Sequence, residues 1–168
     1  MLTKNFYAYI KASFSGSNSV ATFTKTDGST STVGLNSDYP PFSVMDEWAK
    51  SASSAGVSFG TGTTPATASD YFLESILNDN KINVATPSAV SFSRGDTSEE
   101  YSATFGVTNK TADAITISEM GLTAIPYNGN PIIYVLVDRT VLDAPVTIPA
   151  GQSKQITYTI RFNYGDAV

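Results

Sequence analysis

The sequence of 168 residues contains no cysteine and no histidine. Without cysteine there can be no disulfide, no thiolate nucleophile and no cysteine-ligated zinc or iron–sulfur site. Without histidine, the commonest general base near neutral pH and the commonest metal ligand are both missing. The composition therefore excludes Ser-His-Asp and Cys-His catalysis. We expect no cofactor and no metal.

Charge is also scarce, and positive charge most of all. Only 15% of the residues are charged, the formal net charge is −5, and no two of the ten lysines and arginines are adjacent. A nucleic-acid partner is not expected, because no basic surface would displace counterions from phosphates. No apolar run approaches the roughly 20 residues that cross a bilayer. Residues 1–5 also lack the apolar stretch of a secretory leader. We expect a soluble protein made in a cytoplasm, with no membrane partner.

Small hydroxyl residues are abundant, with 21 serines and 21 threonines, and they alternate with apolar residues. Over 155–164, isoleucine, tyrosine and phenylalanine occupy every second position, and 100–109 repeats the pattern. Strict period two predicts half-buried strands. Shorter strands are expected at 6–14, 20–26, 29–35, 90–93, 114–118, 132–137 and 145–149. Of these, 132–137 is expected to be a central strand buried on both faces, and Asp27-Gly28 to be a hairpin turn.

Helical signals are few. Short helices are expected at 42–52 and 69–77, separated by a surface loop at 56–68. The sequence thus predicts a mainly β protein, an antiparallel β-sandwich of jelly-roll or Ig-like type with one or two short helices. Residues 1–50 are expected to form an N-terminal β arm or meander with a short helix, and 51–168 the sandwich, both within one compact unit.

Three short motifs are better explained by turns than by function. Gly60-Thr61-Gly62-Thr63-Thr64 has no following lysine, which a phosphate-binding loop requires. Arg94-Gly95-Asp96 matches an integrin-binding tripeptide but also suits a turn between strands. Asn109-Lys110-Thr111 is a formal glycosylation sequon that also suits a polar hairpin turn.

Acidic residues offer the remaining route to catalysis. Paired carboxylates support glycoside hydrolysis, so Glu74, Glu99 and Glu119 are the candidates for a hydrolase. Glu119 is unusual because the apolar pattern slips in phase between Ile117 and Met120, which a β-bulge would explain. We expect Glu119 to be partly buried and bonded to backbone amides or to Arg139. This interpretation favours structure over catalysis, and no catalytic residue is assigned.

Three stretches together carry a resemblance to a known class. They are Phe59–Glu74, Ile117–Leu122, and Leu136–Val141 followed by Ile148–Gln152 and an alternating terminal strand. This order resembles small β-sandwich structural proteins of tailed bacteriophages, found among head, collar and tail components, including those of gut phages. The resemblance covers about residues 57–164. It implies a virion protein, made in the bacterial cytoplasm, that assembles with copies of itself and with other virion proteins and has no catalytic residues.

The residues themselves are compatible with assembly. The apolar N-terminal segment is expected to act as an arm that adds a strand to a neighbouring copy. Its candidate assembly residues are Phe6, Tyr7, Tyr9, Ile10 and Phe14. The alternative function is a receptor- or glycan-binding module of a phage fibre or tail tip, in which Trp48 and the nine tyrosines would supply aromatic faces for a host-surface glycan.

Overall fold

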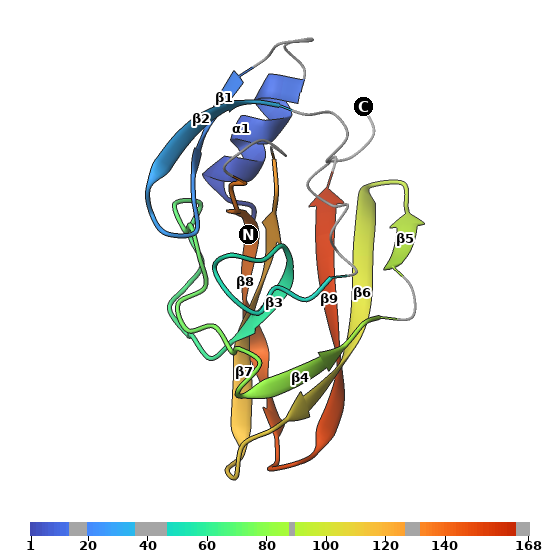
Figure 1. Ribbon diagram of the computed structural model, residues 1–168. Coiled ribbons are helices and arrows are strands. Elements are labelled where there is room, and N and C mark those ends of the chain that lie inside the picture. The colour runs from blue at the N-terminus through green and yellow to red at the C-terminus, as the bar shows by residue number, and fades with distance from the viewer. Residues whose placement is uncertain (14–19, 36–46, 88–89, 127–131, 164–168) are drawn as a thin grey trace.

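The computed structural model of the chain describes residues 1–13, 20–35, 47–87, 90–126 and 132–163. These residues form one helix and nine strands, so the predicted mainly β class is confirmed (Figure 1). The elements are α1 (Lys4–Ser13), β1 (Val20–Thr24), β2 (Thr30–Gly34), β3 (Gly56–Gly60), β4 (Ile82–Ala85), β5 (Val90–Arg94), β6 (Ser98–Asn109), β7 (Ile115–Ala124), β8 (Val135–Ile148) and β9 (Ser153–Asn163).

The strands form three antiparallel sheets. Strands β1 and β2 make a hairpin, β3, β7 and β8 make a second sheet in the order β3-β7-β8, and β4, β6 and β5 make a third. Strand β9 joins the third sheet by pairing with β6 from Ser98 to Thr108. The second and third sheets pack on each other through apolar faces, which gives the expected sandwich-like arrangement.

The core confirms the alternation expected of the terminal strand. In β9, Ile156, Tyr158 and Ile160 are buried while the residues between them are exposed. Across the sandwich, the ring of Phe59 in β3 meets that of Phe105 in β6 edge to face, with centroids 5.6 Å apart. Such aromatic pairs add to the stabilisation from burial alone.

The N-terminal segment corrects one prediction. Residues 4–13 form helix α1, so the strand expected at 6–14 is wrong, and with it the idea that this segment is a β arm. Phe6 and Tyr9 are three residues apart and both buried, a spacing that places them on one face of a helix. Tertiary contacts have overridden the β propensity of the aromatic residues.

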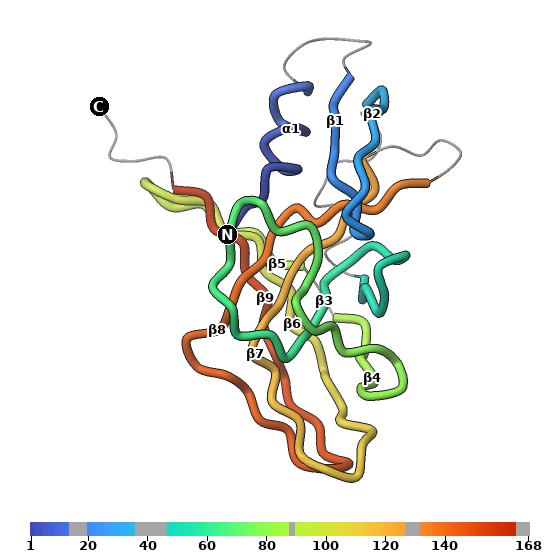
Figure 2. The backbone as a smooth tube through the Cα atoms, turned by 90° about the vertical axis from the view of Figure 1, so that its left-hand side faces the viewer, coloured from blue at the N-terminus to red at the C-terminus, as the bar shows by residue number. Residues whose placement is uncertain are grey.

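The helix does not test the assembly role expected of the candidate residues in this segment, but it shows that they differ in exposure to solvent. Phe6 and Tyr9 belong to the core, Ile10 is half-buried, and Tyr7 is 58% exposed. Phe14 lies outside the described residues. Figure 1 and Figure 2 show α1 beside the β1–β2 hairpin at one end of the molecule. Its buried residues share one apolar cluster with those of the sandwich.

The helix contacts strand β8 through the first residues of the chain. Thr3 donates its backbone N–H to the carbonyl of Val137 at 3.0 Å, and Arg139 donates to the carbonyl of Met1 at 3.0 Å. Asn5 donates from Nδ2 to the carbonyls of Thr24 and Leu136 at 2.8 and 3.1 Å. Residues 1–3 therefore cover the edge of β8 that β7 leaves open.

Strand β8 differs in part from its prediction. Residues 135–137 are all buried, as expected, but β8 lies at the end of the β3-β7-β8 order and β7 lies in the centre. The strand also continues to Ile148, so the separate piece expected at 145–149 is part of it.

The helix predictions were wrong where they can be judged. Residues 69–77 contain no helix, residues 47–52 contain none, and residues 42–46 lie outside the described part. Of the loop expected at 56–68, the first five residues are strand β3, whose residues are all buried. A strand buried on both faces shows no alternation, and so the sequence pattern gave no sign of it.

The hairpin turn predicted at Asp27-Gly28 is confirmed. Gly28 has a φ of 82°, which the turn between β1 and β2 requires, and Asp27 accepts from the backbone N–H of Ser29 at 2.9 Å. The β8–β9 turn likewise places Gly151 at a φ of 67°. No helix in the part of the chain that the structure describes is long and apolar enough to cross a membrane.

Candidate functional site

Glu119 lies at an irregularity in β7. The pairing of β7 with β8 shifts register between Ile117 and Glu119, which confirms the bulge predicted from the apolar pattern. The residue is fully buried. It lies on the face of the β3-β7-β8 sheet opposite the sandwich core, on the same side as its pairing partner Gly60. The shift turns an acidic side chain under the segment that covers this face.

The carboxylate of Glu119 accepts from three backbone amides and one guanidinium nitrogen. Its Oε1 lies 3.1 Å from the N of Gly62 and 2.7 Å from the N of Ser75. Its Oε2 lies 3.1 Å from the N of Glu74 and 2.8 Å from Nε of Arg139. The predicted bonds to backbone amides or to Arg139 are thus both present. With four donors the buried charge is well compensated.

Arg139 extends the network from β8 toward the surface. Its side chain is 4% exposed, and Nη1 donates to Oδ2 of Asp70 at 2.8 Å. The other terminal nitrogen, Nη2, lies 3.5 Å from Oε2 of Glu74 and makes no hydrogen bond within the described residues. Burial alone would lower the pKa of the guanidinium, but the hydrogen bonds to Asp70 and Glu119 outweigh it and raise that pKa. Arg139 stays charged.

The segment that covers this face, residues 61–76, is called the covering loop here. Glu74 accepts from the backbone amides of Thr63 and Thr64 at 3.0 and 2.9 Å. Hydrogen bonds from Thr64 are the main cause that lowers the pKa of Glu74. For Asp70, burial raises the pKa, yet the bonds from Arg139 and Thr67 outweigh it and lower that pKa. The acids of the loop are thus ionised and hold its ends together.

Two glycines let the loop approach Glu119. A Cβ atom on Gly62 would lie 2.6 Å from Oε1 of Glu119, and one on Gly60 would lie 2.7 Å from Cγ of Glu119. Both distances are too short for a real side chain. The glycines of the Gly60–Thr64 motif therefore make room for a carboxylate in this protein, and the motif needs no phosphate to explain it.

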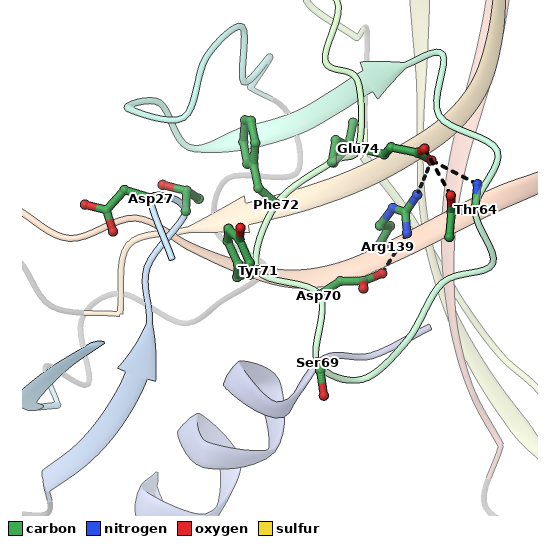
Figure 3. Close-up of a pocket in the computed structure, with 10 residues that line it drawn as sticks. Asp27, Thr64, Ser69, Asp70, Tyr71, Phe72, Glu74 and Arg139 are labelled. Carbon is green, nitrogen blue, oxygen red and sulfur yellow. Dashed lines mark hydrogen bonds and ion pairs between the residues drawn. The ribbon is translucent and has the colours of Figure 1, made fainter. Parts of the chain in front are cut away.

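A cleft of about 570 Å³ opens where the covering loop meets the β1–β2 turn (Figure 3). Its walls come from the turn at Thr26 and Asp27, from Thr64, from residues 69–74 and from Arg139. Tyr71 is 45% exposed. Hydrogen bonds from Ser29 lower the pKa of Asp27 to about 2. The cleft thus combines ionised carboxylates, a buried guanidinium and an aromatic ring.

The structure places two of the three acids proposed for hydrolysis together and the third apart from them. Glu74 and Glu119 join the network of Arg139, whereas Glu99 lies on β6 and forms an ion pair with Arg94. Trp48 is half-buried and bridges to Val57 of β3, and it does not line the cleft. Within the described ranges, no three acidic side chains are grouped so that they could hold a metal ion.

The remaining motifs lie at turns. Arg94-Gly95-Asp96 is exposed between β5 and β6, where Gly95 donates its N–H to the carbonyl of Ser98 at 2.8 Å. Asn109 is 1% exposed and donates from Nδ2 to the carbonyls of Asp113 and Ile148 at 2.8 and 3.0 Å. The buried side-chain amide of Asn109 stabilises the turn between β6 and β7 through these hydrogen bonds.

The sequence pattern missed the cleft itself. Asp27 was recognised only as a turn residue, and Tyr71 was assigned to a helix. No local signal joins the two, because they are 44 residues apart and meet only through the fold. Comparison with known proteins adds no relative: no protein-family profile matches the chain, and no curated protein or solved structure shows a significant similarity to it.

Proposed function

We propose that the chain is a non-enzymatic structural component of a bacteriophage virion that assembles in multiple copies as a head decoration, head fibre, neck or tail protein. The observation that carries the assembly role is the exposed edge strand β5. All five of its residues are exposed, and among the described residues it pairs with β6 alone. An edge of this kind presents unpaired N–H and C=O groups to another chain.

The side chains of β5 add apolar surface to that edge. Val90 is 41% exposed and Phe92 is 53% exposed. The ring of Phe92 lies 5.0 Å from that of Tyr101 in β6, so the two form a continuous aromatic surface next to the open edge. The occupant proposed for this edge is a second copy of the chain, which would bury Phe92 in a contact between two strands.

The use of the buried acids supports a role without catalysis. Glu119, the most deeply buried of the candidate acids, has its oxygens engaged by three backbone amides and by Arg139. A general acid or base needs a proton that substrate can reach. The bacteriophage origin is supported by the sequence resemblance over about residues 57–164, which includes the covering loop and the strands that carry Glu119 and Arg139.

Sedimentation velocity over a hundred-fold range of protein concentration tests the assembly. We expect the wild type to form oligomers and Phe92→Lys to shift toward the monomer, because a charge on the edge opposes strand pairing. Ile132→Lys, which alters an apolar residue that is 48% exposed and lies outside the strands, is the matched control. A wild type that stays monomeric throughout, or an equal response of both variants, would contradict the role of β5.

The assignment to a virion is tested on purified phage particles. Mass spectrometry of gradient-purified particles from the organism that carries this sequence should detect the chain at many copies per particle. Gold-labelled antibodies should then place it on the head, neck or tail in electron micrographs. Particles that lack the chain would overturn the assignment, even if the purified protein forms oligomers.

A further inference from the structure

We propose that the cleft beside Tyr71 binds a neutral sugar, with the tyrosine ring against one face of the sugar and the carboxylates and Arg139 hydrogen-bonded to its hydroxyl groups. This site goes beyond the assembly role and does not depend on it. Asp27 and Tyr71 at the rim and Arg139 at the base are the residues that carry the proposal (Figure 3).

The size of the cleft fits such a ligand. Its volume of about 570 Å³ lies within the range of small-molecule sites. The ring of Tyr71 lies at its entrance, and 45% of the residue is exposed. An exposed aromatic ring offers a flat apolar surface to the C–H groups of a sugar.

The polar groups call for a ligand that both donates and accepts hydrogen bonds. Arg139 is 3% exposed and lines the cleft, and its buried Nη2, 3.5 Å from Oε2 of Glu74, lacks a hydrogen-bond partner among the described residues. A buried donor of this kind is costly unless an acceptor reaches it. The ionised carboxylates of Asp27 and Asp70, by contrast, can only accept. A hydroxyl group does both, and a sugar carries several.

The charge of the cleft argues against ionic ligands. An anion would face the three carboxylates of Asp27, Asp70 and Glu74. A cation would compete with Arg139, which already pairs with Asp70 and lies 3.5 Å from Glu74. Metal coordination is not favoured either, since the described acids form no metal-binding group. A neutral polyhydroxyl ligand avoids these conflicts.

A glycan array followed by saturation-transfer NMR tests the proposal. The fluorescently labelled wild type is applied to an array of neutral, sialylated and sulfated glycans, and the NMR probes are methyl glycosides of neutral hexoses and longer neutral oligosaccharides. We expect binding to neutral glycans. Transfer to the methyl glycosides would identify a single sugar unit as sufficient. Transfer to the oligosaccharides alone would identify a chain of units.

Three cleft variants and one control locate the binding. Tyr71→Ala should weaken it about ten-fold and Tyr71→Phe should keep it, because the ring carries the contact. Asp27→Asn, at an exposed position where the side chain can be changed without loss of packing, should weaken it about three-fold. Tyr7→Ala, exposed on α1 outside the cleft, should leave binding unchanged. Thermal unfolding shows whether each variant is folded. If Tyr71→Ala does not fold, the binding of Asp27→Asn tests the site.

Each contrary result overturns the proposal. They are the absence of binding to any glycan, a preference for sialylated or sulfated glycans, and binding that neither Tyr71→Ala nor Asp27→Asn weakens. Sedimentation of Tyr71→Ala should match the wild type, so that the failure of sugar binding and the failure of assembly are separate results.

Discussion

Nε of Arg139 lies 2.8 Å from Oε2 of Glu119, and both side chains are buried between a sheet and the loop that covers it. The pair joins neighbouring strands, β7 and β8, and each partner also reaches into the covering loop. Glu119 accepts hydrogen bonds from backbone amides of the loop, and Arg139 donates one to Asp70. One ion pair thus fixes the loop that shapes the cleft.

Replacing Glu119 by Gln should destabilise the protein by about 3–5 kcal/mol, because it leaves the buried Arg139 without one of the two carboxylates that lie 2.8 Å from it. The side-chain NH₂ group of the glutamine would also face backbone N–H groups or Nε of Arg139, which are themselves donors. Urea denaturation measures the loss. Glu100→Gln removes an ion pair with Arg161, whose side chain is 61% exposed, and should cost about 0–1 kcal/mol. Equal losses in the two variants would contradict the role given to Glu119.

Gly62→Ala should destabilise the protein by about 1–3 kcal/mol, as overpacking does elsewhere. The added methyl would lie 2.6 Å from both Oε1 of Glu119 and Cβ of Glu74, and Glu119 cannot move without giving up its hydrogen bonds. Thermal denaturation measures the effect. Gly34→Ala in the exposed strand β2, where an added Cβ meets nothing within 4 Å, is the control and should change the melting temperature little.

Stability should fall in acid in a way that depends on the covering loop. The pKa values of Asp70 and Glu74 in the folded protein lie below their ordinary values of 3.8 and 4.5. The folded state thus binds these protons less tightly than the unfolded chain. The stabilisation is complete above the ordinary values and is lost as the pH falls through the lower ones. Melting temperatures from pH 7 to about pH 2.5 should show this decline. A Glu74→Gln variant should show a shallower one, and an unchanged slope would contradict the assignment.

Asn109→Ala should cost about 1–3 kcal/mol, because it removes the side-chain donor to the carbonyl of the buried Ile148 and one of two side-chain donors to the carbonyl of Asp113. It also removes the acceptor of the N–H of Thr111, 2.8 Å away. Asn83→Ala, at an exposed position of β4, is the control and should be within about 0.5 kcal/mol of the wild type. Chemical denaturation of both distinguishes a structural asparagine from one that serves only as a modification site.

The local pattern of the sequence predicted those elements in which one face is buried and the other is wet. The alternation in 100–109 and 155–164 predicted β6 and β9, and the phase slip near Glu119 predicted its bulge. These features follow from period two alone.

Elements decided by distant partners could not be predicted in this way. The composition of 69–77 suggested a helix, in which the N–H of Glu74 would donate to the carbonyl of Asp70. The amides of Glu74 and Ser75 instead donate to Glu119, 45 and 44 residues further along the chain. Similarly, the aromatic residues of 6–14 suggested a strand, while Asn5 and its bonds to β1 and β8 hold this segment as a helix. The cleft could not be predicted for the same reason, because residues 69–74 and the β1–β2 turn, which line it, are distant in the sequence.

The contact between residues 1–3 and β8 sets an order on synthesis at the ribosome. Thr3 and Asn5 bond to Leu136 and Val137, so after their own synthesis these two residues must wait for more than 130 others. At ribosomal rates this delay is on the order of ten seconds. The native docking of α1 on β8, which completes the burial of Phe6 and Tyr9, therefore comes only after β8 has been made, although α1 leaves the exit tunnel before every described strand.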